Sequence, residues 1–88
     1  MNTTAVYNKA QAITPSDTSN LDGTVGNPAN AKTCQAIYVG GGGVVQVVFM
    51  NGSVCGFTCG HGDVLPVAAA RVNDTGTTAS YLMALYQV

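Results

Sequence analysis

Charged side chains are scarce in this chain. Three Lys or Arg and four Asp or Glu residues make up 8% of its 88 residues, against about 25% in an ordinary soluble domain. A freely diffusing monomer usually stays soluble through such charges, so we expect much of the surface to face other protein. A monomer kept soluble by its Thr, Ser, Asn and Gly residues is the alternative. The lack of a basic stripe argues against phosphate-driven nucleic-acid binding.

Long apolar runs and paired cysteines are also lacking. No run approaches the ~20 residues of a membrane span, and residues 1–4 contain neither the basic nor the apolar region of a signal peptide. We therefore expect no membrane partner and synthesis in a cytoplasm. The three cysteines are an odd number, which argues against a disulfide framework. A chain this short suits one core.

Residues 1–33 carry no sustained apolar period. They are rich in Thr, Asn, Ser, Asp and Ala, with Pro15, Gly23, Gly26 and Pro28 spread among them. This composition predicts an extended N-terminal arm, which at ~3.3 Å per residue could reach about 100 Å onto a neighbour. We expect the arm to be dispensable for folding of residues 34–88.

Residues 34–88 are predicted to form a β domain. Short apolar runs alternate with glycine or turn signals, so the fold class is all-β, a small five-or-more-stranded sandwich or barrel. A helix at 64–72 is the rival local interpretation, but Pro66 would fit only its first turn. The expected strands are residues 34–39, 44–50, 53–59, 64–72 and 77–86.

Asn51-Gly52 predicts a hairpin between the second and third runs. The dipeptide is typical of a two-residue type I′ turn, whose central residues both need positive φ. Such a turn would place Phe49 opposite Val54. It would also place Val48 opposite Cys55, and Gln46 opposite Phe57.

An ordered set of short motifs gives the chain a family resemblance. It resembles the head spike base, or capsid-decorating, proteins of bacteriophages and gene transfer agents, from about Ala12 to Tyr86. Residues 22–33 and 55–61 depart from that family's usual pattern. The motifs that carry the resemblance are residues 12–18, 20–21, 36–40, 64–67, 71–73, 75–79 and 84–86.

The resemblance implies a non-enzymatic virion structural protein on the outer capsid surface. The implied partners are the major capsid protein, further copies in a homotrimer or homopentamer, and a head fibre protein. The alternative is a receptor- or glycan-binding module of a phage fibre or tail. Its candidate sugar-binding side chains would be the four tyrosines Tyr7, Tyr38, Tyr81 and Tyr86.

The cysteines raise the alternative of a zinc site or a thiol active site. Cys34, Cys55, Cys59 and His61 could supply three thiolates and an imidazole to zinc, but the paired C-x2-C knuckle is missing. Buried strand cysteines are the favoured interpretation, with no metal and no cofactor. Cys59, His61 and Asp63 could likewise form a thiol nucleophile, base and acid, yet beside Gly60 and Gly62 they favour a polar loop. We expect no catalytic residues.

One further tract could be mistaken for a ligand site. Residues 40–43 are all glycine, as in a phosphate-binding loop, but such a loop must lead from a strand into a helix. This tract leads into the strongest predicted strand, so a turn or bulge is expected.

Overall fold

The fold is all-β, as predicted. The computed structural model describes residues 7–87, apart from the side chain of Asn30. Within them the only helical element is a single 3-10 turn, and no helix is long and apolar enough to cross a membrane. The elements are β1 (Lys9–Ala12), η1 (Pro28–Asn30), β2 (Ala36–Gly41), β3 (Gly43–Val48), β4 (Val54–Cys59), β5 (Asp63–Leu65), β6 (Arg71–Val72) and β7 (Ser80–Tyr86).

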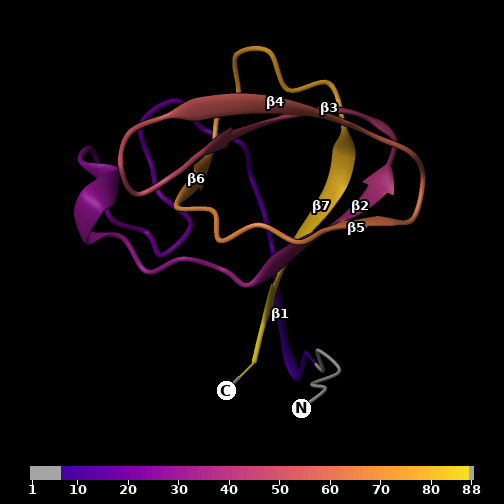
Figure 1. Ribbon diagram of the computed structural model, residues 1–88, viewed down its shortest axis with the longest axis horizontal. Helices are drawn as coiled ribbons and strands as arrows, with labels where there is room; N and C mark the ends of the chain where they lie inside the picture. The colour runs from indigo at the N-terminus through magenta and orange to yellow at the C-terminus, as the bar shows by residue number, and fades with distance from the viewer. Residues whose placement is uncertain (1–6, 88) are drawn as a thin grey trace.

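Two antiparallel sheets enclose the core. One has the strand order β1-β7-β2-β5 and the other the order β4-β3-β6 (Figure 1). β-branched and small side chains meet between them, because alternate residues of each strand point inward. The most completely buried residues of the core are Ile37, Val39, Val45, Val47, Val72 and Cys34.

The β3–β4 hairpin forms where it was predicted, but its register is shifted by one residue. Val48 lies opposite Val54 and Val47 opposite Cys55, so the predicted facing pairs were wrong. The Phe49 N–H donates to the Ser53 carbonyl, and the Gly52 N–H to the Phe49 carbonyl, each at 2.9 Å. Gly52 has φ +86° while Asn51 does not have positive φ. These features define a three-residue loop with glycine in the left-handed position, instead of a type I′ turn.

No helix forms at residues 64–72. β5 ends at Leu65, β6 begins at Arg71, and the connection between them is irregular. The Ala70 N–H donates to the Val48 carbonyl at 2.9 Å, while Ala69 and Ala70 are fully buried. Small side chains are needed here because the connection runs directly against the core, and this need explains the alanines that suggested a helix.

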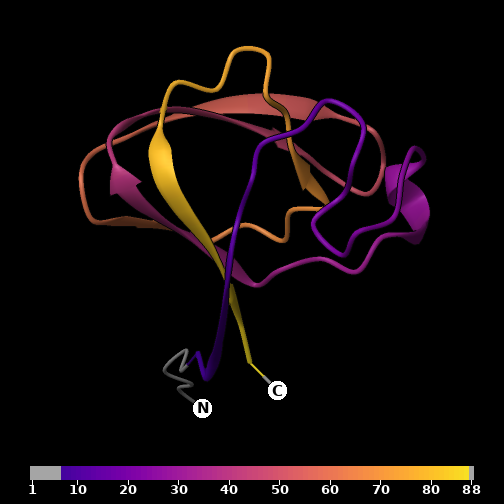
Figure 2. The same cartoon turned by 180° about the vertical axis from the view of Figure 1, so that it is seen from behind.

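The described part of residues 1–33 lies on the rest of its own chain. β1 pairs with β7, and the N–H groups of Ser16 and Leu21 donate to the carbonyls of Val72 and Ala70 at 2.9 and 2.8 Å. Ile13 and Leu21 pack against the core. Figure 2 shows this segment crossing the back of the molecule. The division into folding units at residue 33 stays a prediction, and residues 1–6 lie outside the described part.

Candidate assembly surface

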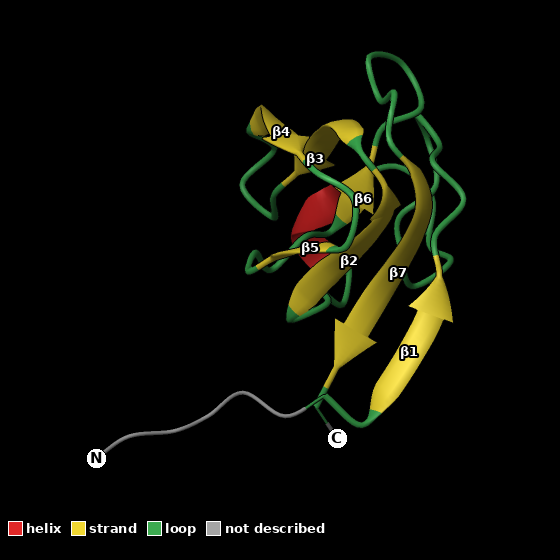
Figure 3. Cartoon of the chain, turned by 90° about the vertical axis from the view of Figure 1, so that its right-hand side faces the viewer, coloured by secondary structure: helices red, strands yellow, loops and turns green. Residues whose placement is uncertain are grey.

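The outward side of sheet β1-β7-β2-β5 is apolar. On β2 and β7 the residues Ile37, Val39, Leu82 and Ala84 belong to the core, so their sequence neighbours point away from it. Residues directly opposite on paired strands share a face. The pairing of β1, β7, β2 and β5, which lie side by side in Figure 3, therefore gives the composition of this surface. We call it the outer face, and it consists of Ala10, Ala12, Ala36, Tyr38, Val64, Tyr81, Met83 and Leu85, of which Ala36 is fully buried.

The outer face exposes large apolar side chains and no charge. Tyr81 is 84% exposed, Val64 49% and Tyr38 39%. Contiguous apolar patches on the surface of a soluble protein mark interaction sites more often than single exposed residues do. The outer face is therefore one part of the surface on which the scarcity of charge noted in the sequence appears, and an uncharged face suits contact with protein.

Tyr81 is held in a strained backbone conformation at the edge of this face. Its φ is 53°, in the left-handed region that bulky residues rarely adopt, and it is the only described non-glycine residue with positive φ. Gly40 of β2 lies against it, and a Cβ atom at Gly40 would lie 2.8 Å from the Tyr81 Cβ. The glycine makes room for the tyrosine. Strain of this kind clusters at functional sites.

The glycine tract connects two strands, as expected for a bend and not for a phosphate loop. Gly40 and Gly41 end β2, and Gly43 begins β3. A Cβ atom at Gly43 would lie 2.7 Å from the Ala79 nitrogen. The tract therefore allows close backbone approach where the chain passes from one sheet to the other.

The four candidate zinc ligands lie in different environments. Cys34 and Cys59 are buried, and Cys55 is exposed on β4. The Cys34 Sγ donates to the Val67 carbonyl at 3.6 Å, and His61 Nδ1 accepts from the Gly42 N–H at 2.9 Å. In the part of the chain that the structure describes, no three His, Cys, Asp or Glu side chains gather as metal ligands. The absence of zinc stays a prediction.

The candidate thiol triad is engaged with loop backbone. Asp63 Oδ2 accepts from the Gly60 N–H at 2.7 Å, and the Cys59 Sγ faces the Phe57 carbonyl at 3.9 Å. Desolvation, with a further contribution from the Asp63 carboxylate, raises the pKa of the Cys59 thiol. A nucleophilic cysteine needs a lowered pKa, so this arrangement works against thiolate formation.

We predict unequal effects of serine at the three cysteines. Cys34→Ser should destabilise the protein by about 1–3 kcal/mol, because its environment is apolar and fully buried, whereas Cys55→Ser should change stability by less than about 0.5 kcal/mol. Chemical denaturation measures both, with Cys34→Ala as the matched control. A chelator should leave the melting temperature unchanged. Equal losses at Cys34, Cys55, Cys59 and His61, together with one bound zinc, would contradict this.

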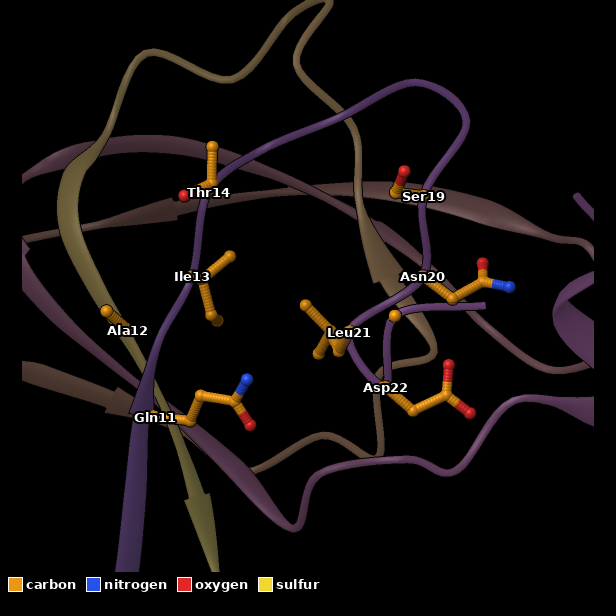
Figure 4. A pocket seen from close by; sticks show the side chains of 9 residues that line it. Gln11, Ala12, Ile13, Thr14, Ser19, Asn20, Leu21 and Asp22 are labelled. Atoms are coloured by element: carbon orange, nitrogen blue, oxygen red, sulfur yellow. The ribbon is translucent and has the colours of Figure 1, made fainter. Parts of the chain in front are cut away.

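A groove of about 300 Å3 lies between residues 11–14 and 19–23. In Figure 4 the side chains of Ile13 and Leu21 approach one another across it. Two of its polar residues are bonded to Thr24: the Asn20 amide donates to Thr24 Oγ1 at 3.0 Å, and Asp22 Oδ1 accepts from the same hydroxyl at 2.6 Å. The groove therefore offers an apolar floor without convergent catalytic groups.

Arg71 fastens the polar segment beside this groove, a role that no sequence motif indicated. Its Nε donates to Asn20 Oδ1 and its Nη1 to the Asp17 carbonyl, both at 2.9 Å, and its Nη2 donates to the Gly26 carbonyl. Asp17 accepts from Thr75, and these hydrogen bonds lower the pKa of its carboxyl group.

Asp22 organises the following turn. Its carboxylate accepts hydrogen bonds from Thr24 and from the Lys32 N–H, which lower its pKa to about 2. Together with the Arg71 contacts, these bonds hold residues 17–32 against the domain. The charged side chains of Arg71, Asp17 and Asp22 are therefore used to hold this loop, and none of them lies on the outer face.

The tyrosines do not form one binding face. Tyr38 and Tyr81 lie on the outer face, whereas Tyr86 packs against the core with Lys9 Nζ 5.3 Å from its ring centroid. None of the four lines the groove. Sugar binding by these side chains stays a prediction that a glycan array would test.

Comparison with known proteins shows to which class of protein this chain belongs. A chain of the capsid of a native gene transfer agent (GTA) particle, computed with C5 symmetry, is similar in fold with a TM-score of 0.75. The two share 30% sequence identity over 92% of this chain and 84% of the other. No protein-family model and no curated protein matches. The protein is therefore a capsid-related structural protein, and it belongs with those of phages and gene transfer agents.

Proposed function

We propose that this protein is a non-enzymatic capsid decoration or head spike base subunit. It binds the major capsid protein on the outer capsid surface and associates with further copies around a three- or five-fold axis. The uncharged outer face, in a chain similar to one from a GTA capsid, is the observation that supports this most directly. A head fibre protein could bind on the side away from the capsid.

The outer face supplies a plausible source of binding energy. Full burial of a large apolar side chain contributes roughly 1.5–3 kcal/mol, and tyrosines are enriched among the residues that dominate interfaces. Tyr81 is 84% exposed and Val64 is 49% exposed, and burial of these two side chains would add no uncompensated charge. Tyr81 would contribute most, because its strained backbone already projects the ring into solvent.

We predict that charge on the outer face weakens capsid attachment. Tyr81→Lys and Val64→Lys should each weaken binding to heads stripped of this protein by about 10-fold or more, the equivalent of about 1.4 kcal/mol, because each places an ammonium group in an apolar contact. Co-sedimentation with the heads measures binding, and circular dichroism verifies the fold. The matched control is Val25→Lys, which replaces an exposed valine outside the outer face.

Two results would refute the proposal. In the first, the outer-face variants bind heads as well as the Val25→Lys control does. In the second, the wild-type chain shows no affinity for stripped heads at all. Imaging of particles with and without the protein would then locate its true position.

A further inference from the structure

The free edge of β4 is a self-complementary site for strand addition. β4 lies at the border of its sheet with β3 on one side only (Figure 1). From the geometry of this edge we infer that two copies of the protein pair through their β4 strands, antiparallel and about a two-fold axis. Two three-stranded sheets would then form one continuous sheet.

β4 differs from the other sheet edges in lacking protection. Natural proteins guard edge strands with lysine, proline, inward charges or short length, because an unguarded edge adds further strands. The edge strand β1 carries Lys9, and β5 is only three residues long, contains Asp63 and is followed by Pro66. The edge strand β6 has only two residues, one of which is Arg71. β4 runs for six residues, VCGFTC, without charge or proline. An unprotected edge of this kind indicates that another strand pairs with β4 in the assembled protein.

The hydrogen-bonding groups available on β4 can be assigned from its register. Phe49 and Ser53 form a hydrogen-bonded pair at the hairpin end, and such pairs alternate along an antiparallel ladder. Cys55, Phe57 and Cys59 therefore bond to β3. The backbone N–H and C=O groups of Val54, Gly56 and Thr58 point to the open edge, and no described residue bonds to them.

The alternation selects one register for a β4–β4 pair. Pairing Gly56 with Gly56 of the second copy, and Val54 with Thr58, uses every outward group and gives about six interchain hydrogen bonds. A shift by one outward position in either direction lowers this number to about four. The occupant that matches all groups is thus a second copy of this strand, because β1 and β5 are shorter and guarded.

This pairing goes beyond the proposed function and does not depend on capsid binding. A two-fold contact cannot itself build a ring of three or five subunits, so such rings would form through another surface. In an icosahedral shell each two-fold axis lies midway between two adjacent five-fold axes and midway between two adjacent three-fold axes. Pairs of β4 strands would there link neighbouring rings, as a cement protein requires.

Disulfide trapping in the purified protein tests the register. In a hydrogen-bonded pair the Cα atoms are about 5.5 Å apart, within the range that a disulfide spans. The variant is Gly56→Cys with Cys55→Ala, which leaves a single exposed thiol since Cys34 and Cys59 are buried. The new Cβ displaces only the flexible end of Gln46. With oxidised glutathione as the oxidant, we expect most of the protein to become a covalent dimer.

Two comparisons make the trapping result specific. Ala29→Cys in the same Cys55→Ala background places an exposed thiol on η1 and should give at least 10-fold less dimer. Adding Thr58→Pro to the Gly56→Cys variant removes one outward N–H but none that bonds to β3, so the dimer should disappear while the melting temperature changes little. Phe57→Pro, by contrast, removes a bond to β3 and should unfold the chain.

The proposal is overturned if Gly56→Cys gives no more dimer than Ala29→Cys, or if Thr58→Pro leaves the yield unchanged. It is also overturned if the wild-type thiol Cys55 cross-links as completely as Gly56→Cys, because the inferred register places Cys55 opposite Phe57 of the second copy. Each of these outcomes can occur whether or not the protein binds capsids, so failure here is distinct from failure of the proposed function.

Discussion

Removal of residues 1–30 should unfold the purified protein. The truncation takes away β1, which covers the edge of β7, and the side chains of Ile13 and Leu21, which pack against the core. It also removes the carbonyl and carboxamide groups that bond to Arg71. Losing two half-buried apolar side chains alone costs roughly 1.5–3 kcal/mol, and the lost strand pairing and Arg71 contacts add to this loss, against a total stability of roughly 5–15 kcal/mol for a small domain.

Circular dichroism and thermal melting would measure the loss. We expect no cooperative transition for the truncated chain, while deletion of residues 1–6, which removes none of these contacts, should leave one. A cooperative melt of the 31–88 fragment near the wild-type temperature would show instead that the segment is dispensable for folding. That is the result the sequence pattern alone predicts for an extended arm.

The sequence predicts a dispensable arm and the structure a segment needed for folding, and the way the N-terminal segment is held explains this difference. Residues 13–26 present only isolated apolar positions, so hydrophobic periodicity gives no signal. What fixes them is backbone hydrogen bonding to Ala70 and Val72 and the fork of Arg71 donors. Such contacts depend on where distant parts of the chain meet, and composition cannot reveal them.

The strands were predictable because β-branched runs and turn residues are local signals. The type of fold and the position of the β3–β4 turn both follow from them. The register does not, because Asn51-Gly52 fits a two-residue turn and also the last two positions of a three-residue loop. In the protein, Asn51 Oδ1 accepts from the N–H and hydroxyl of Ser53 at 3.0 and 2.7 Å, which favours the longer loop.

The outer face was only partly predictable. Alternation in residues 77–86 separates Tyr81, Met83 and Leu85 from Leu82 and Ala84, but both sets are apolar. The sequence therefore indicates two covered faces without saying which is the core. Sheet pairing with β2 decides it, since Ile37 and Val39 are fully buried with Leu82 and Ala84. The strained φ of Tyr81 has no signature in the sequence beyond the glycine that faces it.

Replacing Arg71 by methionine should cost about 2–4 kcal/mol of stability while keeping an unbranched apolar stem. Among the described residues, the guanidinium is the only donor to Asn20 Oδ1, and Asn20 is just 5% exposed. Loss of that donor leaves a buried acceptor unsatisfied, and the carbonyls of Asp17 and Gly26 also lose their partner. Arg71→Lys should recover little, because an ammonium group cannot reproduce the planar fork that reaches three acceptors.

A double-mutant cycle separates the buried acceptor from the rest of the effect. In Asn20→Leu with Arg71→Met both partners are apolar, so the second substitution should cost at least about 1 kcal/mol less than it does in the wild-type background. Urea denaturation gives the four free energies, and the slopes should agree if all variants unfold in one step. If Arg71→Met alone changes stability by less than about 0.5 kcal/mol, the segment 17–26 does not depend on Arg71, and packing of Leu21 must hold it in place.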